Sequence, residues 1–239
     1  DGTKPWKHFA HGVSGYDGNE PRIAIILSGL GLGASTTEAA MALPHEISLS
    51  FSPYSRRIGQ WSATAREKGH DVLLDLPMET ERYPAMDPGP YGLLASLGAA
   101  ENYERLTKIM TKTEGYVGML TPLREVLTTN ANVIAPVVDA LSKHGLMLVS
   151  STVEVPLPFS QISQKASVPV LSADLILDER IPESHIKQKL AQLEDLAQKQ
   201  GYAIGIGRSF PVTVELVGIW AKSLQQKGIR LVPITALAE

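Results

Sequence analysis

Acidic side chains fall at the ends of two predicted strands. Asp75 and Glu79 bracket a Leu-Pro-Met segment after the third strand, and Asp174 and Asp178 flank a Leu-Ile-Leu segment after the sixth. Carboxylates at such positions can act as general bases or bind sugar hydroxyls, although they more often cap helices or hold loops. We take Asp75, Glu79 and Asp174 as the candidate catalytic residues.

Basic and hydroxyl side chains end other predicted strands. Arg208 directly follows Gly-Ile-Gly, where its guanidinium could bind an anionic or hydroxyl-rich ligand or pair with one of the acids. Ser28 and Ser150 also end strands, but neither lies in the Gly-x-Ser-x-Gly turn that exposes a nucleophilic serine. The sequence therefore gives little support to a serine nucleophile.

Motifs for cofactors and metals are weak. The residues from Gly29 to Ala34 match a loose Gly-x-Gly-x-x-Ala fingerprint, but no acid ends the second strand to hold a ribose hydroxyl. The six histidines are poorly placed as zinc ligands, no His-x-x-x-His pair occurs, and there is no cysteine. We therefore expect neither a nucleotide, nor a histidine-based zinc site, nor another cofactor.

Alternating strands and helices must position these side chains. Residues 22–27 form a continuous apolar strand candidate, and a glycine-rich turn and a helix candidate at residues 34–43 follow it. The further strand candidates are residues 47–51, 72–76, 116–118, 146–149, 168–171, 203–206 and 230–233. Glycines typical of helix C-caps precede most of them, at Gly69, Gly115, Gly145, Gly201 and Gly228.

This alternation predicts a mostly parallel sheet with outer helices, either closed as a barrel or open and doubly wound. The eight strand candidates favour the barrel. In both architectures the ligand site lies at the carboxyl ends of the strands, where the candidate residues fall. The longest connection, residues 77–98, is long enough to form a wall of a cleft there.

The composition restricts the class of protein. The chain has 239 residues, of which 44% are hydrophobic and 20% charged, and its net charge is −3. These values suit one globular domain, so we divide the chain into an N-terminal extended arm at residues 1–20 and a barrel domain at residues 21–239. No basic cluster favours nucleic acid, and no apolar run approaches the ~18 residues of a membrane-spanning helix.

Several segments, taken in order, resemble the divergent polysaccharide deacetylase family, a bacterial branch of the barrel-shaped deacetylases. The most specific are residues 51–54, 69–79, 83–84, 87–90, 115–118 and 203–207, together with Trp220 and residues 228–233. The resemblance extends over residues 21–237. It implies a deformed (β/α) barrel of about seven to eight mostly parallel strands.

The residues that would carry the family's chemistry are altered in this chain. Active members resemble metal hydrolases with two aspartates after the first strand, where this sequence has Ser28-Gly29. Pro122 and Arg208 each stand where the family has a histidine, and Asp75 stands where one is often found. Without metal ligands nothing activates a water or polarises an amide carbonyl, so the resemblance implies binding without hydrolysis.

Our leading hypothesis is a catalytically degenerate deacetylase-like domain of carbohydrate or cell-envelope metabolism. It would bind a glycan or peptidoglycan fragment, or an envelope protein, in the strand-end cleft, where aromatic and polar groups suit a sugar. The expected ligand-binding residues are Ser28, Tyr54, Asp75, Glu79, Tyr91, Arg124, Ser150, Asp174 and Arg208. The resemblance also implies a periplasmic or cell-envelope location.

The alternative is a metal-dependent carbohydrate deacetylase with a rearranged metal site. Asp75, Glu79 and Asp174 would supply oxygen ligands, which favour a divalent cation such as Mg²⁺ or Mn²⁺ over zinc. A third possibility is a structural cell-envelope protein, which would present a partner surface and hold neither a small ligand nor a metal.

Overall fold

The computed structural model describes residues 4–9, 20–123, 130–152 and 155–238, and nine of its strands form one sheet. The strands are β1 (Arg22–Leu30), β2 (Ser48–Phe51), β3 (Val72–Asp75), β4 (Gly118–Thr121), β5 (Met147–Ser150), β6 (Val170–Ser172), β7 (Leu175–Ile176), β8 (Tyr202–Arg208) and β9 (Arg230–Leu231). Their order is β6-β5-β4-β3-β2-β1-β8-β7, and β9 pairs with β1. All the ladders are parallel, as predicted.

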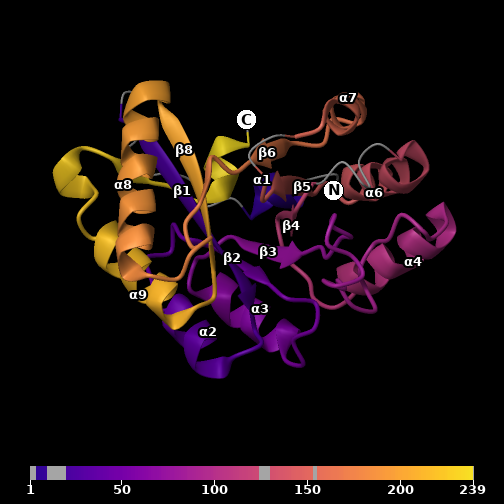
Figure 1. Ribbon diagram of the computed structural model, residues 1–239, viewed down its shortest axis with the longest axis horizontal. Coiled ribbons are helices and arrows are strands. Elements are labelled where there is room, and N and C mark those ends of the chain that lie inside the picture. Colours follow the sequence, from indigo (N-terminus) through magenta and orange to yellow (C-terminus); the bar gives the residue numbers. More distant parts are fainter. Residues whose placement is uncertain (1–3, 10–19, 124–129, 153–154, 239) are drawn as a thin grey trace.

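Most of the helices cover the outside of this sheet, whereas α1 and η2 pack at its amino end. The helices are α1 (Pro5–His8), α2 (Ala34–Ala40), α3 (Ile58–Glu67), α4 (Ala99–Met110), α6 (Ala131–Lys143), α7 (Leu157–Lys165), α8 (Glu183–Gln200) and α9 (Pro211–Ala221), with the 3₁₀ helices η1 (Gln225–Lys227) and η2 (Ile234–Leu237). Figure 1 shows α8 and α9 on one flank of the strands and α4 and α6 on the other. None of the helices in the described ranges is long and apolar enough to cross a bilayer.

One extended segment joins the two edges of the sheet. Strand β6 pairs with β5, and after only Ala173 and Asp174 the chain continues as β7, which pairs with β8. The Ala173 amide donates to the Ser150 carbonyl at 2.9 Å, and the Asp174 amide donates to the Ile204 carbonyl at 2.8 Å. Because consecutive residues contact both edges, the sheet curls into the deformed (β/α) barrel that was predicted.

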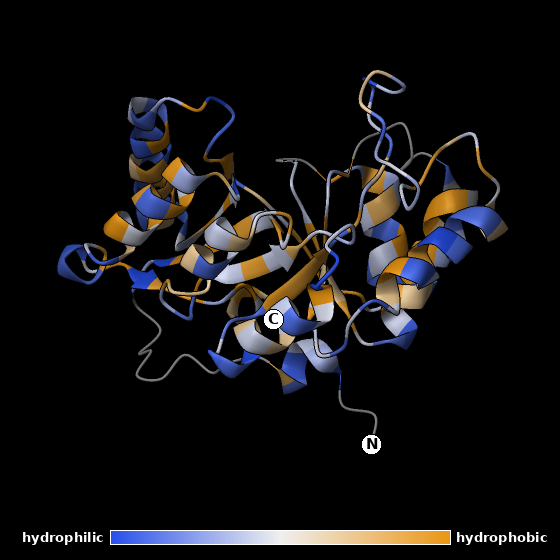
Figure 2. Ribbon diagram, turned by 90° about the horizontal axis from the view of Figure 1, so that it is seen from below, coloured by the Kyte–Doolittle hydropathy of each residue, from blue (hydrophilic) through white to orange (hydrophobic). Residues whose placement is uncertain are grey.

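Two apolar clusters lie on the two faces of the sheet, one inside the barrel and one outside it. The larger cluster packs the outer face of the strands against the helices, as Leu49 and Phe51 do on β2. The smaller contains Ala24 and Ile26 of β1 and Ile206 of β8, and no described residue of α2 to α9 belongs to it. Figure 2 shows the apolar strands at the centre and helices with polar outer faces. Side chains therefore alternate along each strand between the interior and the helix layer.

Glycines end the helices where the sequence predicted. Helix α8 buries Ile186, Leu190 and Leu193 on one stripe and stops at Gly201, whose φ of 89° places it in the left-handed region. The four other predicted capping glycines also have positive φ. A residue with a Cβ is strained in this conformation, so these glycines fix the point at which each helix turns into the next strand.

The amino end of the barrel is closed by both chain termini. The Ile234 amide of η2 donates to Ser48 Oγ at 3.0 Å, and both the amide and the hydroxyl of Thr235 donate to Asp71 Oδ2. Trp6 and Phe9, in and next to α1, pack against the interior cluster. Within the segment predicted as an extended arm, residues 5–8 form the short helix α1, which Pro5 starts and which brings these two aromatic rings to the barrel.

Candidate functional site

The interior of the barrel changes from apolar to polar at the carboxyl ends of the strands. On β1 and β8, the interior residues Ile26 and Ile206 are followed two positions later by Ser28 and Arg208, which pair in register. On β3, Leu73 lies in the interior cluster, so alternation turns Asp75 inward as well. We call this polar set the strand-end layer; its members are Ser28, Ser50, Asp75 and Arg208.

Asp75 joins three strands. Its Oδ2 accepts a hydrogen bond from the Gly29 amide of β1 at 2.9 Å, and its Oδ1 accepts one from the Ser50 hydroxyl of β2 at 2.5 Å. Burial raises the pKa of the Asp75 carboxyl, while these two hydrogen bonds act in the opposite direction. A carboxyl with a raised pKa has the property expected of a general base, but here both of its oxygens hold neighbouring strands.

Arg208 is fixed by an aspartate that the candidate list did not include. The Asp178 carboxylate is fully buried and accepts hydrogen bonds from the Arg208 amide at 2.7 Å, the Arg208 Nε at 3.3 Å and the Thr213 hydroxyl at 2.9 Å. The Asp178 carbonyl accepts a further bond from Arg208 Nη2. The Arg208 side chain remains 50% exposed, and its guanidinium lies 4.6 Å from the centre of the Phe210 ring. Arg208 therefore pairs with an acid and also keeps an accessible charge, which were the two roles predicted for it.

The glycine turn at the end of β1 connects Asp75 to the Arg208 region. The Gly29 amide binds Asp75, and the Gly29 carbonyl accepts a hydrogen bond from the Ser209 hydroxyl at 3.0 Å. The Ser28 hydroxyl donates to the Gly207 carbonyl at 3.3 Å. The turn predicted as a weak nucleotide fingerprint thus links β1, β3 and β8.

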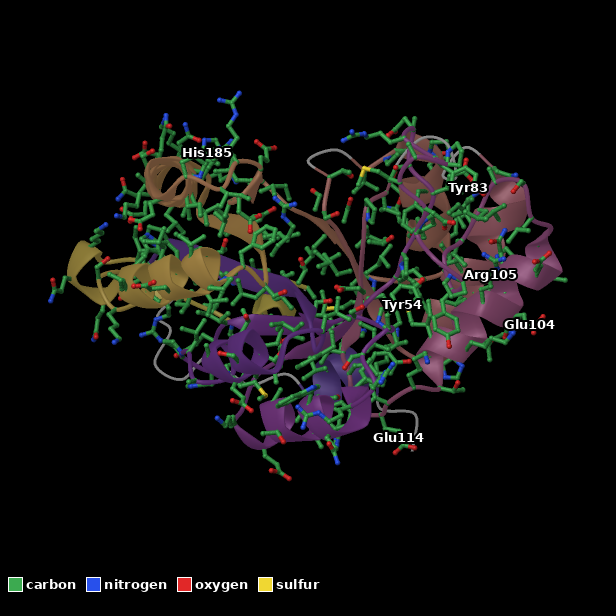
Figure 3. All side chains as sticks on the ribbon, turned by 60° about the horizontal axis from the view of Figure 1, so that its bottom comes forward. Tyr54, Tyr83, Glu104, Arg105, Glu114 and His185 are labelled. Atoms are coloured by element: carbon green, nitrogen blue, oxygen red, sulfur yellow. The ribbon has the colours of Figure 1, made fainter. Side chains whose placement is uncertain are left out.

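The two predicted sugar-binding tyrosines lie side by side, but their rings stack on each other. The Tyr54 and Tyr91 rings stack with centres 5.4 Å apart, and Lys112 Nζ lies 4.4 Å from the centre of the Tyr91 ring. The Tyr54 hydroxyl donates to the Pro88 carbonyl at 2.5 Å and accepts from the Tyr91 amide at 3.3 Å. Arg105, beside Tyr54 in Figure 3, donates to the Gly92 carbonyl of the same loop.

Glu79 also holds the connection between β3 and α4. Its Oε2 accepts a hydrogen bond from the Ala95 amide at 2.8 Å, and its own amide donates to the Leu93 carbonyl. Together with the tyrosines, Glu79 therefore fixes the shape of residues 77–98.

Two further candidates lie away from the strand-end layer. Asp174 precedes β7, and its carboxylate accepts from the Ile204 amide and from the Gln200 side chain at the end of α8. Asp174 follows the carboxyl end of β6, as predicted, but Ile204 is four residues before Arg208, about 13 Å along β8, so its carboxylate does not join the strand-end layer. Ser150 is fully buried and bonded to Thr152, and alternation with the interior residue Val149 turns it toward the helices. Arg124 lies outside the described residues.

The side chains of the strand-end layer do not fit a hydrolytic metal site. Ser28 and Gly29 supply no carboxylate, both oxygens of Asp75 are bonded, and Asp174 lies at another level of the barrel. In the described part of the chain, no three His, Asp or Glu side chains gather as a metal-ligand set. The rearranged site of Asp75, Glu79 and Asp174 is therefore not assembled.

Comparison with known proteins agrees with the barrel. The family model of the divergent polysaccharide deacetylases matches residues 25–238. The crystal structure of an uncharacterized protein from Agrobacterium tumefaciens C58 is similar, with a TM-score of 0.92 and 32% identity over 99% of this chain and 96% of that one. The catalytic domain of the peptidoglycan N-acetylglucosamine deacetylase from Eubacterium rectale shares the fold, with a TM-score of 0.55 and 9% identity over 90% and 89% of the two chains.

A curated relative extends the comparison. The Escherichia coli K12 protein YibQ is 24% identical over 197 residues, which cover 82% of this chain and 61% of YibQ. The chain thus spans less than two thirds of the length of this relative.

Proposed function

We propose, from the premise that this chain belongs to the divergent polysaccharide deacetylase family, that it binds a glycan or peptidoglycan fragment at the strand-end layer and does not hydrolyse it. The family's substrates are polysaccharides, and the layer offers the part-buried Ser28 hydroxyl and the accessible Arg208 cation. Such a set suits a sugar chain that carries carboxylates, as peptidoglycan fragments do.

The observation that carries this proposal is the state of Arg208. A guanidinium that is half exposed at the end of a barrel, with its backbone and Nε held by the buried Asp178, has lost much of its freedom before a ligand arrives. Preorganisation of this kind lowers the entropic cost of binding. The outer edge of the guanidinium is the group that meets a carboxylate or a sugar hydroxyl.

The side chains of the strand-end layer support binding rather than hydrolysis. A deacetylase of the familial type requires a metal to activate water, and the residues at the end of β1 are Ser28 and Gly29 rather than acids. The carboxyl in the layer, that of Asp75, uses one oxygen for Ser50 and the other for Gly29. Each oxygen of this carboxylate already holds a neighbouring strand, and binding through Arg208 leaves both hydrogen bonds in place.

Calorimetric titration with N-acetylglucosamine oligomers and with muropeptides tests the proposal. We expect binding that Arg208→Ala weakens about tenfold or more. Arg230→Ala is the matched control, because Arg230 is also ion-paired, with Glu20 at 2.8 Å, but lies at the opposite end of the barrel. Equal affinity of the wild type and Arg208→Ala would reject the site.

Hydrolysis is tested separately, by acetate release from the same ligands with Mg²⁺, Mn²⁺ or Zn²⁺ added. We expect no release above a blank without protein. Metal-dependent release that Asp75→Asn abolishes would replace the proposal with the enzymatic alternative. The proposal also places the protein in the periplasm or cell envelope, which fractionation of the source cells tests.

A further inference from the structure

A cavity lies at the amino end of the barrel. It has a volume of about 330 Å³, and its wall includes Phe9, Arg66, Asp71, Gly115 and Val117, together with His8. Because Asp71 directly precedes β3 and Val117 directly precedes β4, this cavity lies at the end of the strands opposite the strand-end layer. Figure 3 shows Glu114, next to Gly115, on the opposite side of the molecule from Tyr83 in the β3–α4 loop.

The Arg66 guanidinium is packed between Phe9 and Gly115 in this cavity. Its central carbon lies 4.2 Å from the centre of the Phe9 ring, a distance typical of a cation–π contact. The backbone of Gly115 lies against its edge so closely that a Cβ at this position would collide with Nη1. Gly115 has a φ of 73°, so both its conformation and its lack of a side chain make room for the guanidinium.

The N–H groups of Arg66 have no carboxylate partner within 4.0 Å in the described part of the chain. The one acid among the described residues of the cavity wall, Asp71, directs its Oδ2 to the amide and hydroxyl of Thr235 at 3.0 and 2.7 Å. A half-buried guanidinium that packs against an aromatic ring and pairs with no described carboxylate is a binding group for an oxyanion.

We propose that this cavity binds a carboxylate or phosphate group through the Arg66 guanidinium, with Phe9 as its stacking platform. The His8 ring adds a second donor in the cavity wall. The site is independent of the strand-end layer, because the apolar interior cluster lies between the two. Anion binding here and glycan binding at the strand-end layer can therefore succeed or fail separately.

Nuclear magnetic resonance titration of the whole chain with acetate and, separately, with inorganic phosphate tests the site. We expect saturable shifts of the Gly115 and Val117 amides that are lost, or weakened about tenfold, in Arg66→Ala. Arg57→Ala is the matched control: Arg57 lies just before the same helix and 4.3 Å from the Trp61 ring, but it does not line the cavity. Saturation by one anion alone would support the site and identify which of the two chemistries the cavity takes.

Three results would overturn this inference. One is the absence of saturable shifts at Gly115 and Val117 with either anion in the folded wild type. Another is an equal response in Arg66→Ala and the wild type, with both proteins showing the same melting temperature. A loss that Arg57→Ala reproduces would also reject the assignment, since it would report general surface charge rather than the cavity.

Discussion

Replacement of Asp178 tests whether a single buried carboxylate organises the end of β8. Asp178→Ala removes the acceptor for the Arg208 amide, the Arg208 Nε and the Thr213 hydroxyl. Two of these donors, the part-buried amide and the buried hydroxyl, would remain without a partner, at a cost of about 1.5 kcal/mol each. The Nε bond adds about 0.5 kcal/mol, because that side chain is half exposed. We therefore expect a loss of about 3–4 kcal/mol in the free energy of unfolding.

Arg208→Ala should cost far less. It removes the guanidinium but keeps the amide of residue 208 and the Thr213 hydroxyl bonded to Asp178, so we expect a loss of about 1 kcal/mol. Urea unfolding measures both values, and Asp178→Ala should also lower the melting temperature by about 6–16 °C. The control is Asp139→Ala, whose carboxylate is 55% exposed and pairs with Lys143, and which should cost about 0.5 kcal/mol. The reasoning fails if Arg208→Ala costs as much as Asp178→Ala, or if Asp178→Ala costs no more than the control.

Three further predictions concern other groups. Burial raises the pKa of Asp75, so its neutral form stabilises the fold at low pH and its ionisation costs stability as the pH rises. The free energy of unfolding of Asp75→Asn, measured in urea, should therefore rise relative to that of the wild type between pH 4 and pH 7. A difference between the two proteins that does not change with pH would contradict this. Burial lowers the pKa of His70, so the free energy of unfolding should fall as the pH drops below about 6.5, the pKa of the unfolded chain. His70→Gln should lose this pH dependence of stability, and the control His45→Gln, at an exposed position, should keep it. Tyr54→Phe removes two hydrogen bonds and should make residues 77–98 more sensitive to limited proteolysis, whereas Tyr103→Phe, on the surface of α4, should not.

The strand and helix order could be predicted because each unit carries its own local signals. Continuous apolar runs mark the strands, and a glycine that can adopt positive φ marks each helix end. Weak signals gave errors of position: β4 runs from Gly118 to Thr121 rather than over residues 116–118. Strand β7 has two residues, Leu175 and Ile176, too few for a periodicity to appear, so the sequence did not predict that Asp174 binds the Ile204 amide of β8.

The partners of the candidate residues could not be predicted. Asp178 lies four residues after Asp174 in the sequence, but its role depends on the pairing of β7 with β8 and on the position of Thr213 in α9, which are contacts between distant parts of the chain. Tyr54 and Tyr91 have the residue type of a sugar platform, and only the structure shows that their faces are directed at each other. A residue type at a strand end therefore predicts a place more securely than it predicts a role.

The two acids of the strand-end region illustrate this difference. Asp75 joins β1, β2 and β3, and Asp178 joins the end of β7 to β8 and α9, so each carboxylate links three elements through hydrogen bonds. Groups engaged in this way are poorly suited to proton transfer, because both oxygens of each carboxylate already hold neighbouring elements in place. The group with unused capacity is the Arg208 guanidinium, which can recognise charge but cannot act as a base near neutral pH. The binding that we propose for this end of the barrel therefore depends on Arg208, through which a ligand would be held.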